Sequence, residues 1–178
     1  MDVLTRLKVL IRGTCNLPRL KKNGLKVGVN FQMLGECIID PGHCWLISIG
    51  DHVTLAPRVH ILAHDASTKM FLGYTKIGKV TIGNHVFVGA GTIILPNTRI
   101  AGNTIIGAGS VVTKDCESGV YAGNPARYLC SLAEYLDQEK ERMNHTCVYD
   151  REWTIDRITD ERKESMAKDL DHKIGFVE

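Results

Sequence analysis

The chain has 178 residues, enough for one domain with a sizeable core but too few for two full ones. Hydrophobic residues make up 44% and charged residues 24%, which is typical of a folded soluble protein and excludes a disordered one. The net charge of +2 gives no general indication of nucleic-acid binding. The six cysteines show no zinc-ligand spacing, and no secretory signal is recognisable, so we expect a cytoplasmic protein with reduced thiols.

The N-terminal segment, residues 1–24, is basic and partly apolar. Apolar side chains in its first part follow helical spacing and predict a short amphipathic helix that ends near Gly13. The basic side chains suit contact with an anionic membrane surface or a lipid-linked glycan. A solvated face is the commoner meaning of such a charge run, so both interpretations stay open.

Aliphatic residues recur every six positions through the centre of the chain. The most regular series is Ile82, Val88, Ile94, Ile100, Ile106 and Val112. Every sixth residue of a strand returns to the same face, whereas on a helix such a set scatters into three stripes. Glycines and asparagines between these positions favour turns. The pattern predicts a three-sided coil of short strands over residues 25–130, with a sandwich of short strands as the alternative.

The six-residue phase breaks between Ile61 and Ile82, because this interval is not a multiple of six. We therefore expect residues 65–79 to leave the coil as a loop, and loops on rigid scaffolds often carry function. After the coil, residues 131–178 form an acidic extension in which we expect helices at about 131–144 and 160–172. Solenoids need capped ends, and these helices are candidates for that role.

Three segments carry a family resemblance: IGDHVTLAPRVHILAHD, TIGNHVFVGAGTIILPNTRIAGNTIIGAGSVVTKD and YAGNPAR. They resemble the hexapeptide-repeat acyltransferases, most closely the galactoside, maltose and polysaccharide O-acetyltransferases. The resemblance implies a mainly β fold, a left-handed parallel β-helix. It also implies a homotrimer that transfers an acetyl group from acetyl-CoA to a saccharide hydroxyl and needs no metal. Relatives of this compact plan often act in capsule or lipopolysaccharide assembly.

The same resemblance assigns roles to individual residues. His64 matches the general base, and the backbone N–H of Ala90 matches the donor to the tetrahedral oxyanion. Residues matching the cofactor contacts are Ala90, Ala108, Thr113, Lys114 and Arg127. Asp40 keeps an acidic acceptor contact, but Met33 and Leu34 stand where a sugar-binding asparagine falls in galactoside acetyltransferases. A simple galactoside or maltose is therefore a doubtful substrate.

Several alternatives remain at this stage. His60 lies four residues before His64 and is the second candidate for the base, while Asp65 is a candidate to orient His64. A γ-type carbonic anhydrase uses the same coil with zinc, and His60, His64 and His85 are the available ligands, although their spacing does not match that family. A non-catalytic scaffold is the third interpretation, which failure to bind coenzyme A would favour.

Overall fold

The computed structural model describes residues 16–178. The helix predicted within the first thirteen residues lies outside this range. The chain divides between Leu132 and Ala133 into two compact units. None of the helices in residues 16–178 combines the length and the hydropathy needed to cross a membrane.

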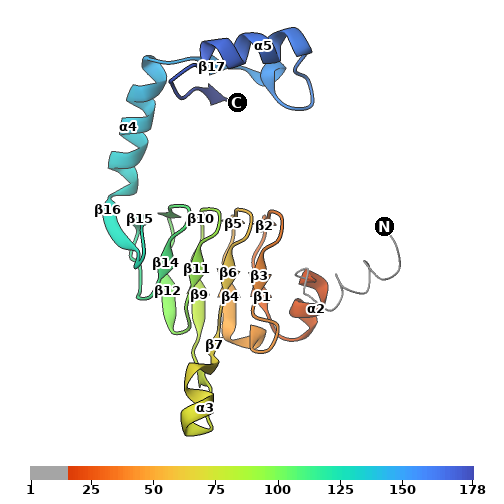
Figure 1. Ribbon diagram of the computed structural model, residues 1–178, viewed down its shortest axis with the longest axis vertical. Coiled ribbons are helices and arrows are strands. Elements are labelled where there is room, and N and C mark those ends of the chain that lie inside the picture. Colours follow the sequence, from red (N-terminus) through yellow and green to blue (C-terminus); the bar gives the residue numbers. More distant parts are fainter. Residues whose placement is uncertain (1–15) are drawn as a thin grey trace. The chain divides into compact units, whose positions relative to one another are not determined.

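The first unit is a coil whose turns contribute one short strand to each of three sheets (Figure 1). Sheet A contains β1 (Lys26–Val27), β4 (Ile47–Ile49), β9 (Val80–Ile82) and β12 (Thr98–Ile100). Sheet B contains β2 (Gln32–Met33), β5 (Thr54–Leu55), β10 (Val86–Val88), β13 (Thr104–Ile106), β15 (Gly119–Ala122) and β16 (Arg127–Cys130). Sheet C contains β3 (Ile38–Ile39), β6 (His60–Ile61), β11 (Ile93–Ile94) and β14 (Val111–Val112). Pairing within the three sheets is parallel except between β15 and β16, which confirms the predicted parallel coil.

The predicted six-residue series forms the core. Ile82 pairs with Ile49 and Ile100 in sheet A, so equivalent aliphatic side chains stack from coil to coil. All six members of the series are at most 2% exposed, and burying each such side chain stabilises the fold by about 1.5–3 kcal/mol. Buried hydroxyls between them are satisfied, because Thr98 and Ser110 donate to the carbonyl oxygens of Leu95 and Gly107. The coil interior is therefore apolar, and these two buried hydroxyls in it are hydrogen-bonded.

The corners of the coil use residues that tolerate a left-handed backbone. Between sheets A and B, positive φ angles of 51°, 54°, 54° and 56° occur at Asn30, His52, His85 and Asn103. The rings of His52 and His85 stack, with centroids 4.8 Å apart. Between sheets B and C, the equivalent left-handed positions are occupied by Gly91 and Gly109, with φ of 69° and 68°, and in the two earlier coils by Glu36 and Arg58, with φ of 54° and 61°. Asparagine and glycine adopt this region at the lowest cost, which explains their place in the repeat.

The corner between sheets C and A differs, because two insertions interrupt it. After β3, residues 40–46 form a wide turn that ends in η1 (Cys44–Leu46). After β6, the antiparallel strands β7 (His64–Asp65) and β8 (Lys76–Ile77) enclose η2 (Ala66–Thr68) and α3 (Lys69–Leu72). This hairpin projects from the coil as a loop at the predicted place (Figure 1).

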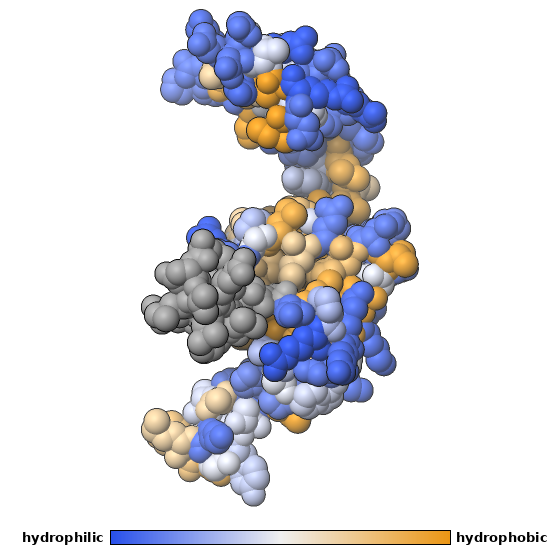
Figure 2. Space-filling model, turned by 90° about the vertical axis from the view of Figure 1, so that its right-hand side faces the viewer, coloured by the Kyte–Doolittle hydropathy of each residue, from blue (hydrophilic) through white to orange (hydrophobic). Residues whose placement is uncertain are grey.

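The tip of this projecting hairpin is apolar. Met70, Phe71 and Leu72 of α3 are 87%, 80% and 68% exposed, and Figure 2 shows pale-orange atoms beside blue ones at the end of the projection. So large an exposed apolar group on a short loop is unusual in a soluble monomer and is typical of an interaction site.

Both ends of the first unit are covered. At the N-terminal end, Asn16 caps α2 (Leu17–Lys22) by accepting a hydrogen bond from the Arg19 N–H, and Leu20 of this helix is buried in the core. At the other end, β16 folds back antiparallel on β15 and extends sheet B past the last coil. Within the first unit a strand covers this end, and capping by the C-terminal helices stays a prediction.

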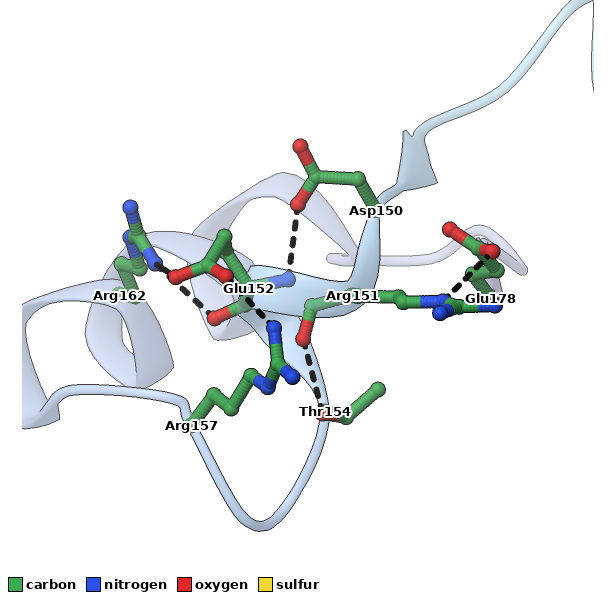
Figure 3. Close-up of polar contacts among 7 residues, drawn as sticks. All are labelled: Asp150, Arg151, Glu152, Thr154, Arg157, Arg162 and Glu178. Carbon is green, nitrogen blue, oxygen red and sulfur yellow. Dashed lines mark hydrogen bonds and ion pairs between the residues drawn. The ribbon is translucent and has the colours of Figure 1, made fainter.

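The second unit contains α4 (Leu132–Asn144), β17 (Val148–Tyr149), η3 (Arg151–Trp153), α5 (Asp160–Asp169) and β18 (Phe176–Val177). Its helix α5 ends three residues before the expected boundary. Tyr149 is its most buried large side chain, and Arg162 lies over the Trp153 ring at 5.5 Å. Glu152 pairs with Arg157 and Arg162, and Arg151 pairs with Glu178 (Figure 3). This unit is held by a small aromatic core and surface ion pairs.

Candidate active site

The insertions at the corner between sheets C and A bring Asp40 and His64 together. The two residues come from successive coils, since β3 pairs with β6 and each residue follows its strand. His64 Nδ1 lies 2.5 Å from Asp40 Oδ2. An ionised carboxylate only accepts hydrogen bonds, so Nδ1 carries the proton and donates it. The pair is therefore a charge-assisted hydrogen bond between a carboxylate and an imidazole.

Asp40 is rigidly held and closed to solvent. Its side chain is 0% exposed, and its oxygens also accept hydrogen bonds from the backbone N–H groups of Gly42, His43 and Ala63. Burial acts to raise the pKa of Asp40, but the hydrogen bonds from His64, Ala63 and Gly42 outweigh it and hold this pKa below its ordinary value. The carboxylate is thus ionised at neutral pH. This environment does not favour the expected acceptor contact, because the carboxylate is buried and its oxygens are occupied by hydrogen bonds from the protein.

His64 is held with one ring nitrogen inward and the other free. Because Nδ1–H is bonded to Asp40, the neutral imidazole carries a lone pair on Nε2. The side chain is 38% exposed, so solvent and substrates reach the ring. Among the hydrogen bonds of residues 16–178, none occupies Nε2 of His64. An oriented imidazole with a free, accessible lone pair has the properties of a general base.

The other proposed orienting residue, Asp65, faces away from His64. Its carboxylate lies 2.6 Å from Lys76 Nζ and accepts a hydrogen bond from the Ser67 N–H. The bond from Lys76, followed by that from Ser67, lowers the pKa of Asp65 to about 2. Adjacent residues on a strand point to opposite faces, so Asp65 points away from His64 and instead links β7 to β8 through Lys76.

His60 and His85 do not join the pair. His60 lies in β6, in register with Ile38 and Ile93 on the outer side of sheet C. His85 stacks on His52 at the corner between sheets A and B. In the described part of the chain, the cluster of potential metal ligands consists of Asp40, His43 and His64. Within one chain, the three histidines of the carbonic anhydrase interpretation, which places its zinc between subunits, are not brought together.

Backbone donors line the corner between sheets B and C. Ala90 and Ala108 occupy equivalent turns in successive coils, and Gly109 N–H donates to the Ala90 oxygen at 2.8 Å. Among residues 16–178, no acceptor is bonded to the backbone N–H of Ala90 or of Ala108. A Cβ atom added at Gly91 or Gly109 would meet nothing within 4 Å, so the corner is open. Free N–H groups on an open surface suit an anionic or carbonyl oxygen.

The remaining predicted cofactor-binding residues lie at two different corners of the coil, one between sheets C and A and the other between sheets B and C. Thr113 and Lys114 are exposed and follow β14, at the same corner as His64. Arg127 begins β16 directly after Ala126, whose N–H donates to Val111 at the start of β14, on the side of Ala108. Within one chain the structure therefore brings Thr113 and Lys114 to the corner of His64. It leaves Ala90, Ala108 and Arg127 at the other edge of sheet C.

Sequence analysis missed one member of the site, His43. Its ring centroid lies 5.0 Å from that of His64, and its Nδ1 lies 3.9 Å from Asp40 Oδ2. The wide turn at 40–46 interrupts the six-residue phase just as the later loop does. That first interruption was the available signal, and it marks the corner where Asp40 and His43 approach His64.

Known proteins support the same fold. Residues 79–114 match the family described as bacterial transferase hexapeptide (six repeats). The chain is 35% identical to protein CapG of Staphylococcus aureus over 143 residues, covering 77% of this chain and 83% of that protein. It is 37% identical to galactoside O-acetyltransferase of Escherichia coli K12 over 126 residues, covering 66% and 58%. The chain belongs to the hexapeptide-repeat acyltransferase family.

Solved structures agree. A maltose O-acetyltransferase from Clostridium difficile 630 is 39% identical and superimposes with a TM-score of 0.53, covering 61% of this chain and 59% of that one. A hexapeptide-repeat acetyltransferase from Vibrio cholerae O1 biovar eltor, complexed with acetyl coenzyme A, is 25% identical with a TM-score of 0.55, covering 61% of each chain. These likenesses support the left hand of the β-helix. The chain spans less than two thirds of the length of several of these relatives.

Proposed function

We propose that this protein is an acetyl-CoA-dependent O-acetyltransferase that acts on a saccharide hydroxyl, with His64 as general base. The observation that carries the proposal is the 2.5 Å hydrogen bond from His64 Nδ1 to the buried Asp40 carboxylate. It fixes the tautomer that leaves the Nε2 lone pair free, and Asp40 stabilises the imidazolium formed during the reaction. Asp40 is thus a positioning residue.

The reaction follows from this arrangement. Nε2 of His64 takes the proton of the acceptor hydroxyl while the hydroxyl oxygen attacks the thioester carbonyl carbon of acetyl-CoA. The new C–O bond gives a tetrahedral intermediate whose oxyanion needs a hydrogen-bond donor, and the unbonded N–H of Ala90 suits that role. Collapse breaks the C–S bond, and the imidazolium returns the proton to the departing thiolate. The products are the acetyl ester and free coenzyme A.

The rest of the acetyl-CoA site is proposed from side-chain and backbone chemistry. The unbonded Ala108 N–H and the exposed Thr113 suit the amide and hydroxyl groups of pantetheine. Lys114 and Arg127 are exposed cations that suit the phosphates. The donor itself is supported by the Vibrio cholerae relative, which was solved with acetyl coenzyme A.

The site is incomplete in one chain, which supports an oligomer, and the resemblance to the hexapeptide-repeat family implies that this oligomer is a homotrimer. The Gly91 N–H donates a hydrogen bond to the Pro57 carbonyl oxygen in the preceding coil. Ala90, which adjoins Gly91, therefore stacks beside Pro57, seven residues before His64 in the chain. At about 3.3 Å per residue, these seven residues span up to roughly 23 Å, and they run from one edge of sheet C to the other, so the base and the oxyanion donor lie at opposite edges of this sheet. A hydrogen bond to the reacting oxygen spans only about 3 Å. We propose that His64 of one copy meets Ala90 of the next, and that the apolar tip of α3 packs on that neighbour.

The proposal that the acceptor is a saccharide is supported by the names of similar proteins. Enzymes named for galactoside and maltose support a saccharide, while Met33 and Leu34 distinguish this chain from galactoside acetyltransferases. Leu34 is 47% exposed and therefore presents an apolar side chain where a sugar-binding amide is expected. Modification of a surface polysaccharide, with the basic N-terminal segment at a membrane or lipid-linked glycan, stays a prediction.

Mass spectrometry tests the reaction directly. Wild type, His64→Ala and the matched control His60→Ala are incubated with acetyl-CoA and a panel of free sugars, polysaccharide fragments and lipid-linked glycans. We expect acetylation of at least one acceptor by wild type and His60→Ala, and its loss in His64→Ala. Transfer that survives in His64→Ala but not in His60→Ala would reassign the base. Absence of transfer with every acceptor, together with no binding of coenzyme A, would leave the scaffold interpretation.

Mixed oligomers test whether two copies form the site. His64→Ala and Arg127→Glu chains, each expected to be impaired, are co-expressed and purified as hybrids. If the base and the cofactor contacts come from neighbouring copies, about a quarter of the sites in random hybrids are intact and activity returns. If both residues serve the same site within one chain, no intact site forms and activity stays absent.

A further inference from the structure

His43 lies beside the proposed dyad with a polar atom that nothing satisfies. Its Nδ1 is buried and has no hydrogen-bond partner in the part of the chain that the structure describes. The nitrogen lies 3.9 Å from Asp40 Oδ2, too far for a hydrogen bond, and the His43 ring is 5.0 Å from the His64 ring. A buried nitrogen without a protein partner is costly, so in the working protein it has room for a water molecule, a ligand or an ion as its partner.

The three side chains form a recognisable donor set. One ligand atom from each of Asp40, His43 and His64 lies within 4.8 Å of the other two. Asp40 Oδ2 lies 3.9 Å from Nδ1 of His43 and 2.5 Å from Nδ1 of His64. Two imidazoles and one carboxylate suit Zn²⁺ or Co²⁺, whereas Mg²⁺ and Ca²⁺ prefer oxygen ligands alone. Ligands about 2.0–2.1 Å from a tetrahedral metal lie roughly 3.3 Å apart. To reach that spacing, His43 Nδ1 and Asp40 Oδ2, now 3.9 Å apart, must approach each other slightly. His64 Nδ1 and Asp40 Oδ2, now 2.5 Å apart, must separate slightly.

We infer that Asp40, His43 and His64 bind a divalent transition metal ion, Zn²⁺ in particular, and that its binding switches off the base. The binding stands on the geometry of the three side chains, and the inhibition rests on the proposed function. A neutral imidazole carries one proton, so a metal on Nδ1 of His64 displaces that proton to Nε2. Nε2 then has no lone pair for the acceptor hydroxyl. The metal also replaces the hydrogen bond through which Asp40 holds the ring.

Metal binding is measured apart from activity, on the full chain without a histidine tag. Zn²⁺ affinity is taken from competition with a chromophoric chelator, and coordination from the visible absorption of the Co²⁺ form. The variant His43→Gln removes a ligand. The control His85→Gln removes a member of the His52–His85 pair, whose rings are as close, with centroids 4.8 Å apart, but which belongs to no carboxylate cluster.

We expect one Zn²⁺ per chain in wild type and His85→Gln, and an affinity lower by roughly tenfold or more in His43→Gln. A four-coordinate Co²⁺ spectrum without a thiolate charge-transfer band supports the site. Equal affinities in both variants, or a thiolate band that assigns the metal to cysteines, overturn it.

Inhibition is then scored against the basal activity of each variant. Zn²⁺ inhibits acetyl transfer by wild type and His85→Gln at the same concentrations, and His43→Gln needs roughly tenfold more. Zinc bound by this site without loss of transfer overturns the switch. If His64→Ala retains transfer, the proposed base is wrong, but the metal-binding result is still decided by the chelator titration.

Discussion

Two regions of the solenoid are built on the same six-residue repeat but differ in what they bury. In the regular coils of residues 79–114, buried positions hold aliphatic side chains or small hydroxyls bonded to carbonyl oxygens. At the corner between sheets C and A, two insertions bring a buried carboxylate and two imidazoles within 4.8 Å. The uninterrupted repeat therefore supplies a rigid frame, and reactive groups gather where the repeat is interrupted. The two regions should respond differently to substitution.

The largest expected effect is on stability, from the coil. Ile94 is 0% exposed and stacks between Ile61 and Val112 in sheet C. Ile94→Ala leaves a cavity that coils on both sides hold open, so the free energy of unfolding should fall by about 2–5 kcal/mol. The exposed Thr81→Ala of β9 should change it by no more than about 0.5 kcal/mol. Urea unfolding measures both, and equal losses would contradict a core built from the six-residue series.

Asp40→Asn should have the next largest effect, on turnover. Replacing the carboxylate by an amide removes a charge-assisted hydrogen bond, and such bonds contribute about 1.5–3 kcal/mol. We expect kcat to fall by roughly 10- to 150-fold while KM for acetyl-CoA stays unchanged, since the Asp40 side chain is 0% exposed and so inaccessible to the donor. A parallel rise in KM with kcat preserved would show that Asp40 shapes a binding surface and does not orient the base.

The stability contributed by Asp40 should depend on pH. Its pKa in the folded chain is held below the unfolded value of about 3.9, so the unfolded chain takes up the proton first. The contribution is complete above the unfolded pKa and is lost as pH falls through the folded one. The difference in free energy of unfolding between wild type and Asp40→Asn should therefore shrink from pH 6 to pH 3. A constant difference would contradict an ionised, bonded carboxylate.

The smallest expected effect is a difference in alkylation rate between the buried thiols of the coil and the partly exposed thiols beyond it. Burial, reinforced by two neighbouring carboxylates, raises the pKa of Cys116 to about 11, whereas Cys130 and Cys147 are partly exposed. Among the five cysteines of residues 16–178, alkylation of the native protein at pH 8 should modify Cys130 and Cys147 first, because the thiolate is the reactive form and access is required. Peptide mapping by mass spectrometry gives the order, and early labelling of Cys116 would show that the coil opens locally.

The coil could be predicted from sequence because a strict period of six suits strands and not helices. Ile82 to Val112 repeat without interruption, so the core followed directly, and the loop after His64 followed from the loss of phase. The capping of the last coil could not be predicted, since β16 pairs with β15 through an irregular turn around Asn124 and Pro125. That pairing depends on long-range contacts that leave no period in the sequence.

The site was predicted only in part. His64 and Asp40 were both singled out, but their contact requires the register between β3 and β6, which the wide turn at 40–46 obscures. Asp65 was the orienting candidate because it adjoins His64, and strand alternation turns it toward Lys76 instead. His43 carried no motif at all. Its role depends on a buried nitrogen that only coordinates reveal.

The most direct test of the account is the kinetics of His64→Asn. An asparagine amide nitrogen lies about where Nδ1 lies, so this variant keeps a donor for the buried Asp40 carboxylate and removes the base. We expect kcat/KM for acetyl transfer to fall by about 10²–10⁴, with a free energy of unfolding within about 1 kcal/mol of wild type. Unchanged kcat/KM in this folded variant would contradict general-base catalysis by His64.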